Sequence, residues 1–352
     1  MNQNIYQFAK TLKKKVSSFK FDMYHKYYAK EELKVIELVK GKTEPKLIKL
    51  SNEYAKDIFG SQNYAPWLYV YSAFSETFKE GWIPDNYYGK IVVPKISSGY
   101  GKVSFLKSFT KIFFNSNVFP DIGYYVNGLF YSDNYIFIHK NNIKDFLFKN
   151  SNLIVFKLDN SKQGLGVFFL DKNSFDLNKL RLLGNGVFQE FIEQHPFFSE
   201  LMANSVATIR ITTILENNGN ASVRACFLRV GRKNDTHIKE TSEIVIPVNT
   251  LSGNLHVLGY LDAWIAIDKH PDSQVLFANR KIPHFDKCIS VALELQKAMP
   301  FVRCIGWDMT VDKNDNVKVM EWNGYDTDIK FSEATQGPGF SDLGWEKLWK
   351  EQ

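Results

Sequence analysis

The stretch Val302–Asn323 reads VRCIGWDMTVDKNDNVKVMEWN, and the interpretation of the whole chain starts from it. Two runs rich in Val, Ile, Met and Trp flank a polar cluster at residues 312–316, which is typical of a β-hairpin. Successive strand side chains point to opposite faces, so Asp308 would lie opposite the apolar side chains of its own strand. In the return strand the same alternation predicts one shared face for Val317, Val319, Glu321 and Asn323.

A two-residue turn at residues 314–315 would place Asp308 directly opposite Glu321. Two carboxylates and the amide of Asn323 on one face would hold a cation, because the acids otherwise repel each other. Oxygen ligands of this kind suit Mg²⁺, which keeps water and substrate phosphate in its remaining positions. The alternative is a solvated edge hairpin that carries acids without binding a metal.

The composition limits the classes of protein to which the chain can belong. The chain has 352 residues, of which 44% are hydrophobic and 23% charged, as in a soluble globular protein with two or three subdomains. No apolar run approaches the ~20 residues of a membrane span, and the N-terminus lacks the apolar core of a signal peptide. We therefore expect a cytoplasmic protein. Its three cysteines show no CxxC spacing and are expected to be buried and reduced.

Lysine is concentrated between Lys10 and Lys46, in a segment whose apolar residues recur at helical spacing. Between Phe8 and Phe19 these apolar residues form one stripe beside the lysines. Such a helix would either dock on the rest of the chain or lie on an anionic membrane surface. We expect the segment to help bind an anionic acceptor substrate rather than a nucleotide.

Residues 153–170 read LIVFKLDNSKQGLGVFFL and predict two strands joined by a glycine-bearing loop. Such a loop can fold its backbone N–H groups over phosphate oxygens, with Lys157 supplying the neutralising charge. The loop matches neither GxxxxGK[ST] nor GxGxxG, which excludes the Walker and Rossmann motifs here. A further strand at residues 186–192 ends in polar residues that suit the edge of an adenine ring.

Two strands that carry arginine follow, at residues 205–215 and 222–230. Arginines on central strands are unlikely to be buried without a partner. A phosphate, a substrate carboxylate or a local acid must therefore balance the charges of Arg210, Arg224 and Arg229.

Taken in order, these pieces resemble the ATP-grasp superfamily, and within it the sugar-transfer-associated ATP-grasp proteins, which are related to glutamate and amino-acid ligases. The matching pieces span residues 153–323 and read FKLDNSKQGLGV, FQEFIEQHP, SVATIRITTI followed by FLRVG, HPDS ahead of IPHF, and IGWDMTV followed by VMEWN. The resemblance implies an α+β ATP-grasp fold in which two sheet-bearing subdomains clamp ATP behind an N-terminal helical extension. Residues 1–60 would form that basic extension, 61–150 an N-terminal lobe, and 151–352 the nucleotide- and metal-binding core.

The resemblance also implies the roles of individual residues. Mg²⁺, or alternatively Mn²⁺, would be bound by Asp308, Glu321 and Asn323. Arg210 and Arg229 would steady the transferred phosphoryl group or the acyl donor. ATP would be held by an upstream lysine, the strand lysine, the glycine loop and the adenine strand. The upstream lysine is Lys107 or Lys111, and the strand lysine is Lys157. The loop contributes Ser161, Gln163, Gly164 and Gly166, and the adenine strand contributes Gln189, Glu190, Phe191, Ile192 and Glu193.

The implied activity is ATP-dependent joining of a carboxylate and an amine to an amide through an acyl phosphate. The substrates would be small molecules. A sugar or amino-sugar component of a surface polysaccharide such as a capsule would be modified with an amino acid, or an amine would be joined to a uronic acid. A nucleotide- or lipid-linked sugar and peripheral membrane contact are compatible with this activity, and we expect no nucleic-acid partner. The alternatives are an ATP-grasp phosphotransferase acting on a sugar or another small acceptor, and a nucleotide-binding module without turnover. After FLRVG many relatives carry a glycine-rich Asp-Asn stretch, whereas this chain reads RKNDTHIKETSEIVIPV, which leaves the acceptor chemistry open.

Overall fold

The structure, a computed structural model, describes residues 3–161, 164–233, 235–238, 242–325 and 327–351. The chain forms two compact units: residues 1–95, 263–265 and 328–352 make unit 1, and residues 96–262 and 266–327 make unit 2. Within the described ranges, none of the helices combines the length and the apolar character that crossing a membrane requires. The predicted functional division at residues 60 and 150 stays a prediction.

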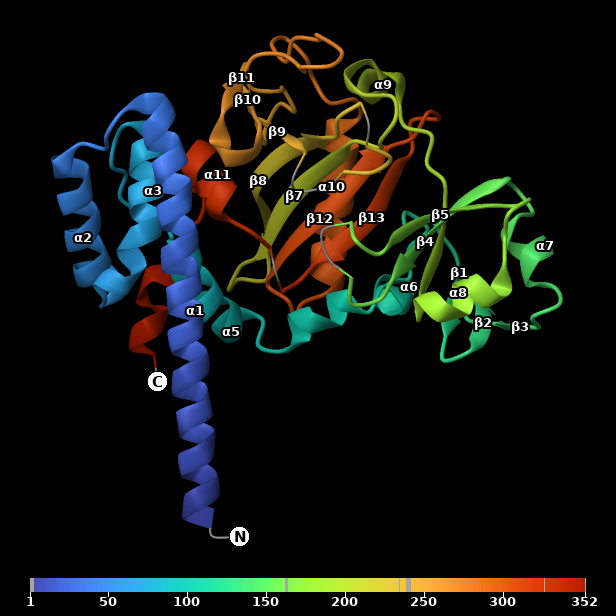
Figure 1. Cartoon of the computed structure of the whole chain (residues 1–352), viewed down its shortest axis with the longest axis horizontal. Coiled ribbons are helices and arrows are strands. Elements are labelled where there is room, and N and C mark those ends of the chain that lie inside the picture. The colour runs from blue at the N-terminus through green and yellow to red at the C-terminus, as the bar shows by residue number, and fades with distance from the viewer. Residues whose placement is uncertain (1–2, 162–163, 234, 239–241, 326, 352) are drawn as a thin grey trace. The chain divides into compact units, whose positions relative to one another are not determined.

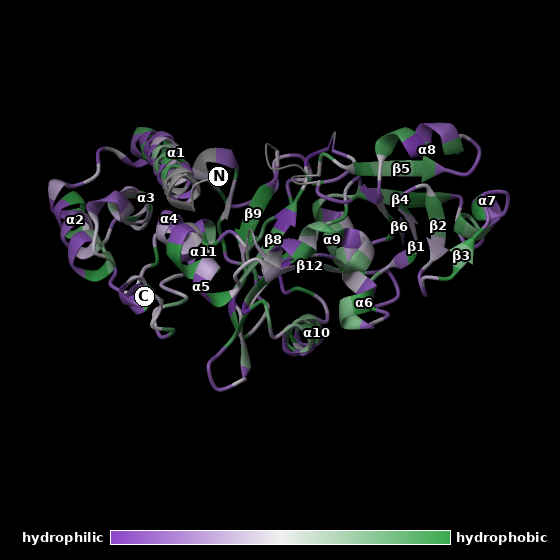
Figure 2. Ribbon diagram, turned by 90° about the horizontal axis from the view of Figure 1, so that it is seen from below, coloured by the Kyte–Doolittle hydropathy of each residue, from purple (hydrophilic) through white to green (hydrophobic). Residues whose placement is uncertain are grey.

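Unit 1 is helical, and the long helix α1 (Gln3–Lys40) extends past the helices beside it (Figure 1). Helix α2 (Pro45–Phe59) begins with a proline in its first turn, and its C-cap is Gly60, whose φ of 74° is the left-handed conformation that favours glycine. Its buried residues are spaced four apart and therefore lie on one face of the helix. Hydrophobic and hydrophilic residues accordingly alternate along the helix (Figure 2). The other α-helices of this part of the chain are α3 (Ala65–Ser75), α4 (Asp85–Tyr87), α5 (Val93–Ile96) and α11 (Lys330–Thr335).

A buried carboxylate links the C-terminal segment to the helices of unit 1. Glu333 of α11 accepts hydrogen bonds from the backbone N–H of Ile83 at 2.7 Å and of Gly339 at 2.8 Å. The Trp82 indole donates to the Glu333 backbone carbonyl at 2.8 Å. Burial raises the pKa of Glu333 to about 7, which the two N–H donors only partly offset.

The first sheet of unit 2 has six antiparallel strands in the order β3-β2-β1-β6-β4-β5. Its β1–β2 hairpin turns at Asn127 and Gly128, which both have positive φ, as a two-residue turn of this kind requires. The strands are β1 (Asp121–Val126), β2 (Leu129–Ser132), β3 (Phe137–Ile138), β4 (Leu153–Leu158), β5 (Val167–Asp171) and β6 (Gly186–Glu190). The helices in this part of the chain are α6 (Thr110–Phe114), α7 (Ile143–Leu147) and α8 (Leu177–Leu183).

The second sheet of unit 2 has seven antiparallel strands in the order β11-β10-β9-β8-β7-β12-β13. They are β7 (Thr208–Leu215), β8 (Ala221–Val230), β9 (Ile244–Pro247), β10 (Gly259–Tyr260), β11 (Ala266–Ile267), β12 (Cys304–Val311) and β13 (Val317–Asn323). Two helices, α9 (Pro196–Leu201) and α10 (Phe285–Ala298), accompany this sheet. The N-terminal helices and the two sheets confirm the expected α+β architecture.

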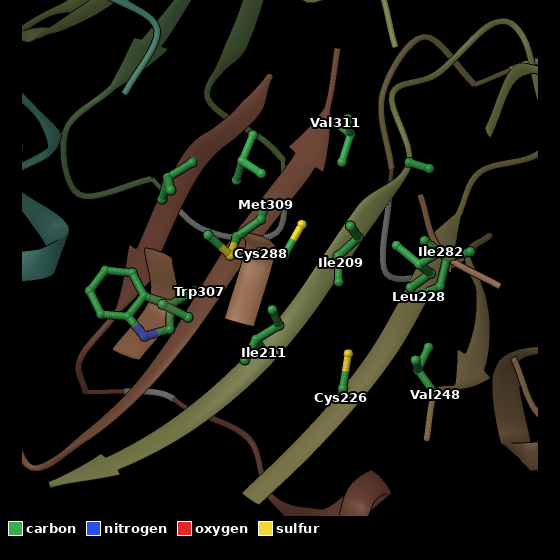
Figure 3. Packing of buried hydrophobic residues seen from close by; sticks show 14 of the residues in the cluster. Ile209, Ile211, Cys226, Leu228, Val248, Ile282, Cys288, Trp307, Met309 and Val311 are labelled. Atoms are coloured by element: carbon green, nitrogen blue, oxygen red, sulfur yellow. The ribbon is translucent and has the colours of Figure 1, made fainter. Parts of the chain in front are cut away.

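Unit 2 has a hydrophobic core on one face of the seven-stranded sheet and a second one in the six-stranded sheet, around Phe130, Phe156 and Phe188. Figure 3 shows Ile209 and Ile211 of β7 beside Trp307 and Met309 of β12, all fully buried. Helix α10 covers this face with Phe285, Cys288, Ala292 and Leu295. The three cysteines, Cys226, Cys288 and Cys304, are buried thiols outside any disulfide, as expected. The opposite face of the same strands carries the polar residues described next.

Candidate functional site

The hairpin of β12 and β13 pairs Asp308 with Glu321, as the sequence predicts. The predicted two-residue turn is nevertheless wrong. Asp312 N–H donates to the carbonyl of Asn316 at 2.9 Å, so the loop is longer, and the register shifts between Asp308 and Met309. Met320 is the extra residue of this β-bulge, because Val319 pairs with Met309 and Glu321 with Asp308.

The bulge also corrects the predicted faces of β13. Val317 and Val319 pack in the core, and so does Trp322, which pairs with Trp307. Val317 and Val319 therefore do not share a face with Glu321, contrary to the simple alternation. The inserted residue allows one strand to bury its apolar side chains on one face and to present Glu321 and Asn323 on the other.

Strand β7 places Arg210 opposite Asp308. The guanidinium Nε lies 2.5 Å from Oδ1 and Nη2 lies 3.0 Å from Oδ2, and the residues are only 7% and 8% exposed. Asn323 Nδ2 also donates to Asp308 Oδ2, at 3.2 Å. Burial alone would raise the pKa of Asp308, but the Arg210 guanidinium holds it below its usual value. Asp308 is therefore ionised at neutral pH.

Arg229 shares the polar face with Arg210, because Arg229 pairs with Thr208, two residues before Arg210 on β7. Its Nε lies 2.5 Å from Glu243 Oε2. Arg224 Nη2 likewise contacts Glu216 Oε1 at 2.8 Å. Of the three kinds of partner considered for these arginines, the structure provides a local acid for each one.

Lys157, at the end of β4, connects the two sheets of unit 2. Its Nζ donates to the carbonyl of Met320, the bulge residue, at 3.2 Å. Burial lowers the pKa of Lys157, and the nearby Glu321 carboxylate opposes that shift. The bulge thus brings the strand lysine and Glu321 to the same place.

The structure separates the two candidate upstream lysines. Lys107 Nζ lies 3.3 Å from Glu321 Oε1 and donates to the Ser161 carbonyl at 3.0 Å. Lys111 Nζ instead pairs with Asp133 Oδ2 at 2.5 Å. Only Lys107 of the two contacts Glu321 and the glycine loop, which makes it the stronger candidate for a phosphate contact.

The loop after β4 requires glycine at two positions. Gly164 has φ of +77°, and a Cβ there would lie 2.8 Å from the His237 ring. A Cβ on Gly166 would lie 2.3 Å from the Cβ of Ser161. His237 and Ile238, which follow β8, therefore pack against the loop. Gln163 lies outside the described residues.

Among residues 189–193, which are predicted to hold adenine and ribose, only Gln189 has a buried side chain. Gln189 is buried and donates from Nε2 to Asp121 Oδ1 at 2.9 Å. Glu190 is exposed and lies 3.6 Å from Lys318. Farther along, the backbone carries the exposed Phe191, the half-buried Ile192 and the exposed Glu193, whose carboxylate contacts Lys313 Nζ at 2.8 Å.

Asp121 is a residue that sequence reasoning missed. It is half-buried at the start of β1, where it accepts hydrogen bonds from Gln189 and, at 3.1 Å, from the Tyr124 hydroxyl. Burial raises its pKa to about 6, although these hydrogen bonds and Lys157 oppose the shift. An acid opening the apolar strand DIGYYV was the available signal.

The donor atoms on the polar face fit a hard divalent cation. Within the described ranges, no cluster of three or more His, Cys, Asp or Glu residues could hold a metal ion. The candidate set contains two carboxylates, Asp308 and Glu321, and the amide of Asn323. Oxygen donors of this kind leave positions for water and phosphate oxygens, as Mg²⁺ sites usually do.

Comparison with known proteins identifies the family. Residues 180–343 match the family described as sugar-transfer associated ATP-grasp. No curated protein matches the chain.

Several solved structures are similar at low identity. An ADP complex of N5-carboxyaminoimidazole ribonucleotide synthetase is 12% identical, with a TM-score of 0.38, and the match covers 62% of this chain and 44% of that one. The L-amino acid ligase from Bacillus licheniformis is 14% identical, with a TM-score of 0.41 and coverages of 71% and 48%. D-alanyl-alanine synthetase A from Vibrio cholerae is 12% identical, with a TM-score of 0.41 and coverages of 73% and 66%. The chain thus spans about half the length of the first two.

The segment matched by the family includes the strands that carry Arg210, Arg229, Asp308, Glu321 and Asn323. Residues 180–343 of this chain therefore belong to the sugar-transfer-associated ATP-grasp family, and the expected α+β ATP-grasp fold is confirmed.

Proposed function

We propose that the protein is an ATP-dependent ligase that joins a carboxylate to an amine through an acyl phosphate. The observation that carries this proposal is the β-bulge at Met320. It gathers Lys157 and Lys107 around Glu321, next to the Arg210–Asp308 pair, on one polar face. A site with several fixed cations and carboxylates suits the transfer of a phosphoryl group, which depends on positioning and charge neutralisation.

In this proposal ATP phosphates take the place beside Lys157, Lys107 and the loop containing Gly164. Both lysines would donate charge-assisted hydrogen bonds to phosphate oxygens, and the backbone of the loop would add neutral donors. Asp308, Glu321 and Asn323 would hold Mg²⁺, or alternatively Mn²⁺. The bound metal would neutralise phosphate charge and orient the oxygens.

The reaction would proceed in two steps. An oxygen of the substrate carboxylate attacks the γ-phosphorus, the bond to the β-phosphate oxygen breaks, and ADP leaves. The amine nitrogen then attacks the acyl carbon, the bond from that carbon to the phosphate oxygen breaks, and phosphate leaves as the nitrogen loses a proton. Arg229, which shares the face with Arg210, would hold the carboxylate or the transferred phosphoryl group.

We further propose that one substrate is a sugar, an amino sugar or a uronic acid used in a surface polysaccharide, and that the reaction takes place in the cytoplasm. The family description supports the connection with sugars. The segment containing His237 packs against the glycine loop, so it is placed to contribute to the choice of acceptor. The competing activity is phosphoryl transfer to a sugar hydroxyl by the same site.

The test measures ADP release with Mg²⁺ and ATP over a panel of amino acids, uronic acids and amino sugars, with and without hydroxylamine. A ligase should form a hydroxamate that depends on both the acid and ATP. ADP release with a phosphorylated sugar and no hydroxamate would instead establish the phosphotransferase. The same assay compares Lys107→Ala with Lys111→Ala as its matched control. Lys111 pairs with Asp133, whereas Lys107 contacts Glu321 in the site.

A further inference from the structure

Helix α1 has two apolar faces that point in roughly opposite directions. One face packs inside unit 1, where Ala29 and Ile36 are buried and the Trp67 indole donates to His25 Nδ1 at 3.2 Å. The other face is an exposed stripe, defined here as the apolar stripe, whose members are between 47% and 66% exposed and comprise Leu12, Val16, Phe19, Met23 and Tyr27. Their spacings of three and four residues align them along one side of the helix.

The apolar stripe is not an extension of the packed face. At 3.6 residues per turn, Phe19 and Met23 lie on the side of the helix away from His25 and Ala29. Helix α1 extends past α3 toward its N-terminal end (Figure 1), and the stripe begins in that N-terminal half of the helix. From Leu12 to Tyr27 it is about 22 Å long at the usual rise per residue. Contiguous exposed apolar surface of this kind marks an interaction site.

The charges beside the apolar stripe indicate what covers it. Lys13 and Lys20 flank one side of the stripe and Lys15 and Lys26 the other, and all four side chains are exposed. Residues 10–20 read KTLKKKVSSFK, with five lysines and no acid. The surface that meets this helix must therefore tolerate or prefer a dense positive charge.

A second copy of the helix would meet the stripe unfavourably. Stripe-to-stripe packing places the flanking lysines of one copy beside those of the other, where like charges repel. An anionic bilayer has the opposite property. It accepts the apolar side chains at the boundary of the acyl chains, and it attracts each lysine near its surface. Long lysine side chains can also reach the headgroups while their stems cover apolar surface.

We propose that the apolar stripe of α1 binds in the plane of an anionic phospholipid bilayer, with its flanking lysines on the headgroups. The aromatic rings of Phe19 and Tyr27 would lie at the interface between headgroups and acyl chains, where such rings are enriched in membrane proteins. This inference rests on α1 alone and is independent of the proposed ligase activity.

The test is flotation of the full chain with vesicles of phosphatidylcholine alone and of phosphatidylcholine mixed with phosphatidylglycerol. The wild type should bind only the anionic vesicles, and added salt should weaken binding. Phe19→Ser combined with Met23→Ser should weaken binding about tenfold or more, because two large apolar groups no longer enter the bilayer. Both residues are exposed, so the variant should keep the wild-type circular dichroism.

The matched control is Leu38→Ser combined with Val39→Ser, which removes two exposed apolar side chains at the far end of the same helix. This control should bind the vesicles like the wild type. Three results would overturn the proposal: no vesicle binding by the wild type, equal binding to neutral and anionic vesicles, or unchanged binding by the Phe19/Met23 variant. A concentration-dependent dimer lost only in that variant would assign the stripe to a second copy instead.

Discussion

Asp308→Asn should cost the protein much of its stability. The change keeps the volume of the side chain but removes the charge that balances Arg210, whose guanidinium is buried and bound by both carboxylate oxygens. Leaving a buried charge without its partner typically costs about 3–5 kcal/mol. We therefore expect the free energy of unfolding to fall by about that amount.

Urea unfolding followed by tryptophan fluorescence measures this loss, since Trp307 and Trp322 lie in the core of the same hairpin. Glu321→Gln is the control, because it alters the cross-strand partner of Asp308. The Glu321 side chain is 31% exposed, and its partner Lys107 keeps the Ser161 carbonyl as an acceptor, so this change should cost less stability than Asp308→Asn. The double replacement of Arg210→Met with Asp308→Leu should be less destabilising than Asp308→Asn. A loss below about 1 kcal/mol for Asp308→Asn would refute the reasoning.

The same pair predicts a dependence on pH. The pKa of Asp308 is lower in the folded protein than its ordinary value of 3.8, so the carboxylate stabilises the fold above that value. The contribution is lost as the pH falls through the folded pKa. The stability difference between wild type and Asp308→Asn should therefore shrink in acid. A difference that stays constant into strong acid would contradict the ion-pair assignment.

Three further changes test other parts of the account. Lys157→Ala should weaken ATP binding by about 1.5–3 kcal/mol, the value of a charge-assisted contact, and unchanged affinity by calorimetry would exclude that role. Glu321→Gln should keep the fold but abolish ATP turnover, so wild-type turnover with Mg²⁺ would remove Glu321 from the metal site. Glu333 has its pKa raised from 4.5 to about 7, so the folded protein holds a proton that the unfolded chain releases between these values. Wild-type stability should consequently fall as pH rises through this range, and Glu333→Gln should lack that slope in urea unfolding at several pH values.

The hairpin shows how far the sequence can predict this site. The predicted pairing of Asp308 with Glu321 is confirmed, but it rests on a two-residue turn that is wrong. The loop is longer, and the bulge at Met320, for which strict alternation has no place, restores the pairing. A signal was present in VKVMEW, where strict alternation would put Met320 and Trp322 on the face opposite Val317 and Val319. All four of these apolar side chains favour burial, which strict alternation on two faces does not allow. The pattern therefore suggests a break in the two-residue period of the strand.

The partners of Arg210 and Lys107 were beyond sequence reasoning, because they come from distant parts of the chain. Arg210 and Asp308 are 98 residues apart, and Lys107 and Ser161 are 54 apart. Only the pairing of β7 with β12, and the approach of residue 107 to the loop after β4, bring them together. The sequence therefore named the charged residues of the site without naming their partners.

Helix α1 illustrates a different limit. Its lysines and apolar spacing were visible in the sequence, but the pattern does not reveal which apolar residues are packed and which are exposed. The structure separates the face around Ala29 and Ile36 from the stripe through Phe19 and Met23. That distinction turns two open alternatives for the segment into a proposal that vesicle binding can test.

The most direct test of the proposed chemistry follows one carboxylate oxygen. The substrate acid identified by the panel is labelled with heavy oxygen in its carboxylate and turned over with ATP, Mg²⁺ and the amine. A reaction through an acyl phosphate transfers one labelled oxygen to the released inorganic phosphate, which mass spectrometry detects. We predict that label in phosphate at a ratio of one oxygen per amide formed. Unlabelled phosphate, with amide formed at the normal rate, would contradict the acyl-phosphate mechanism.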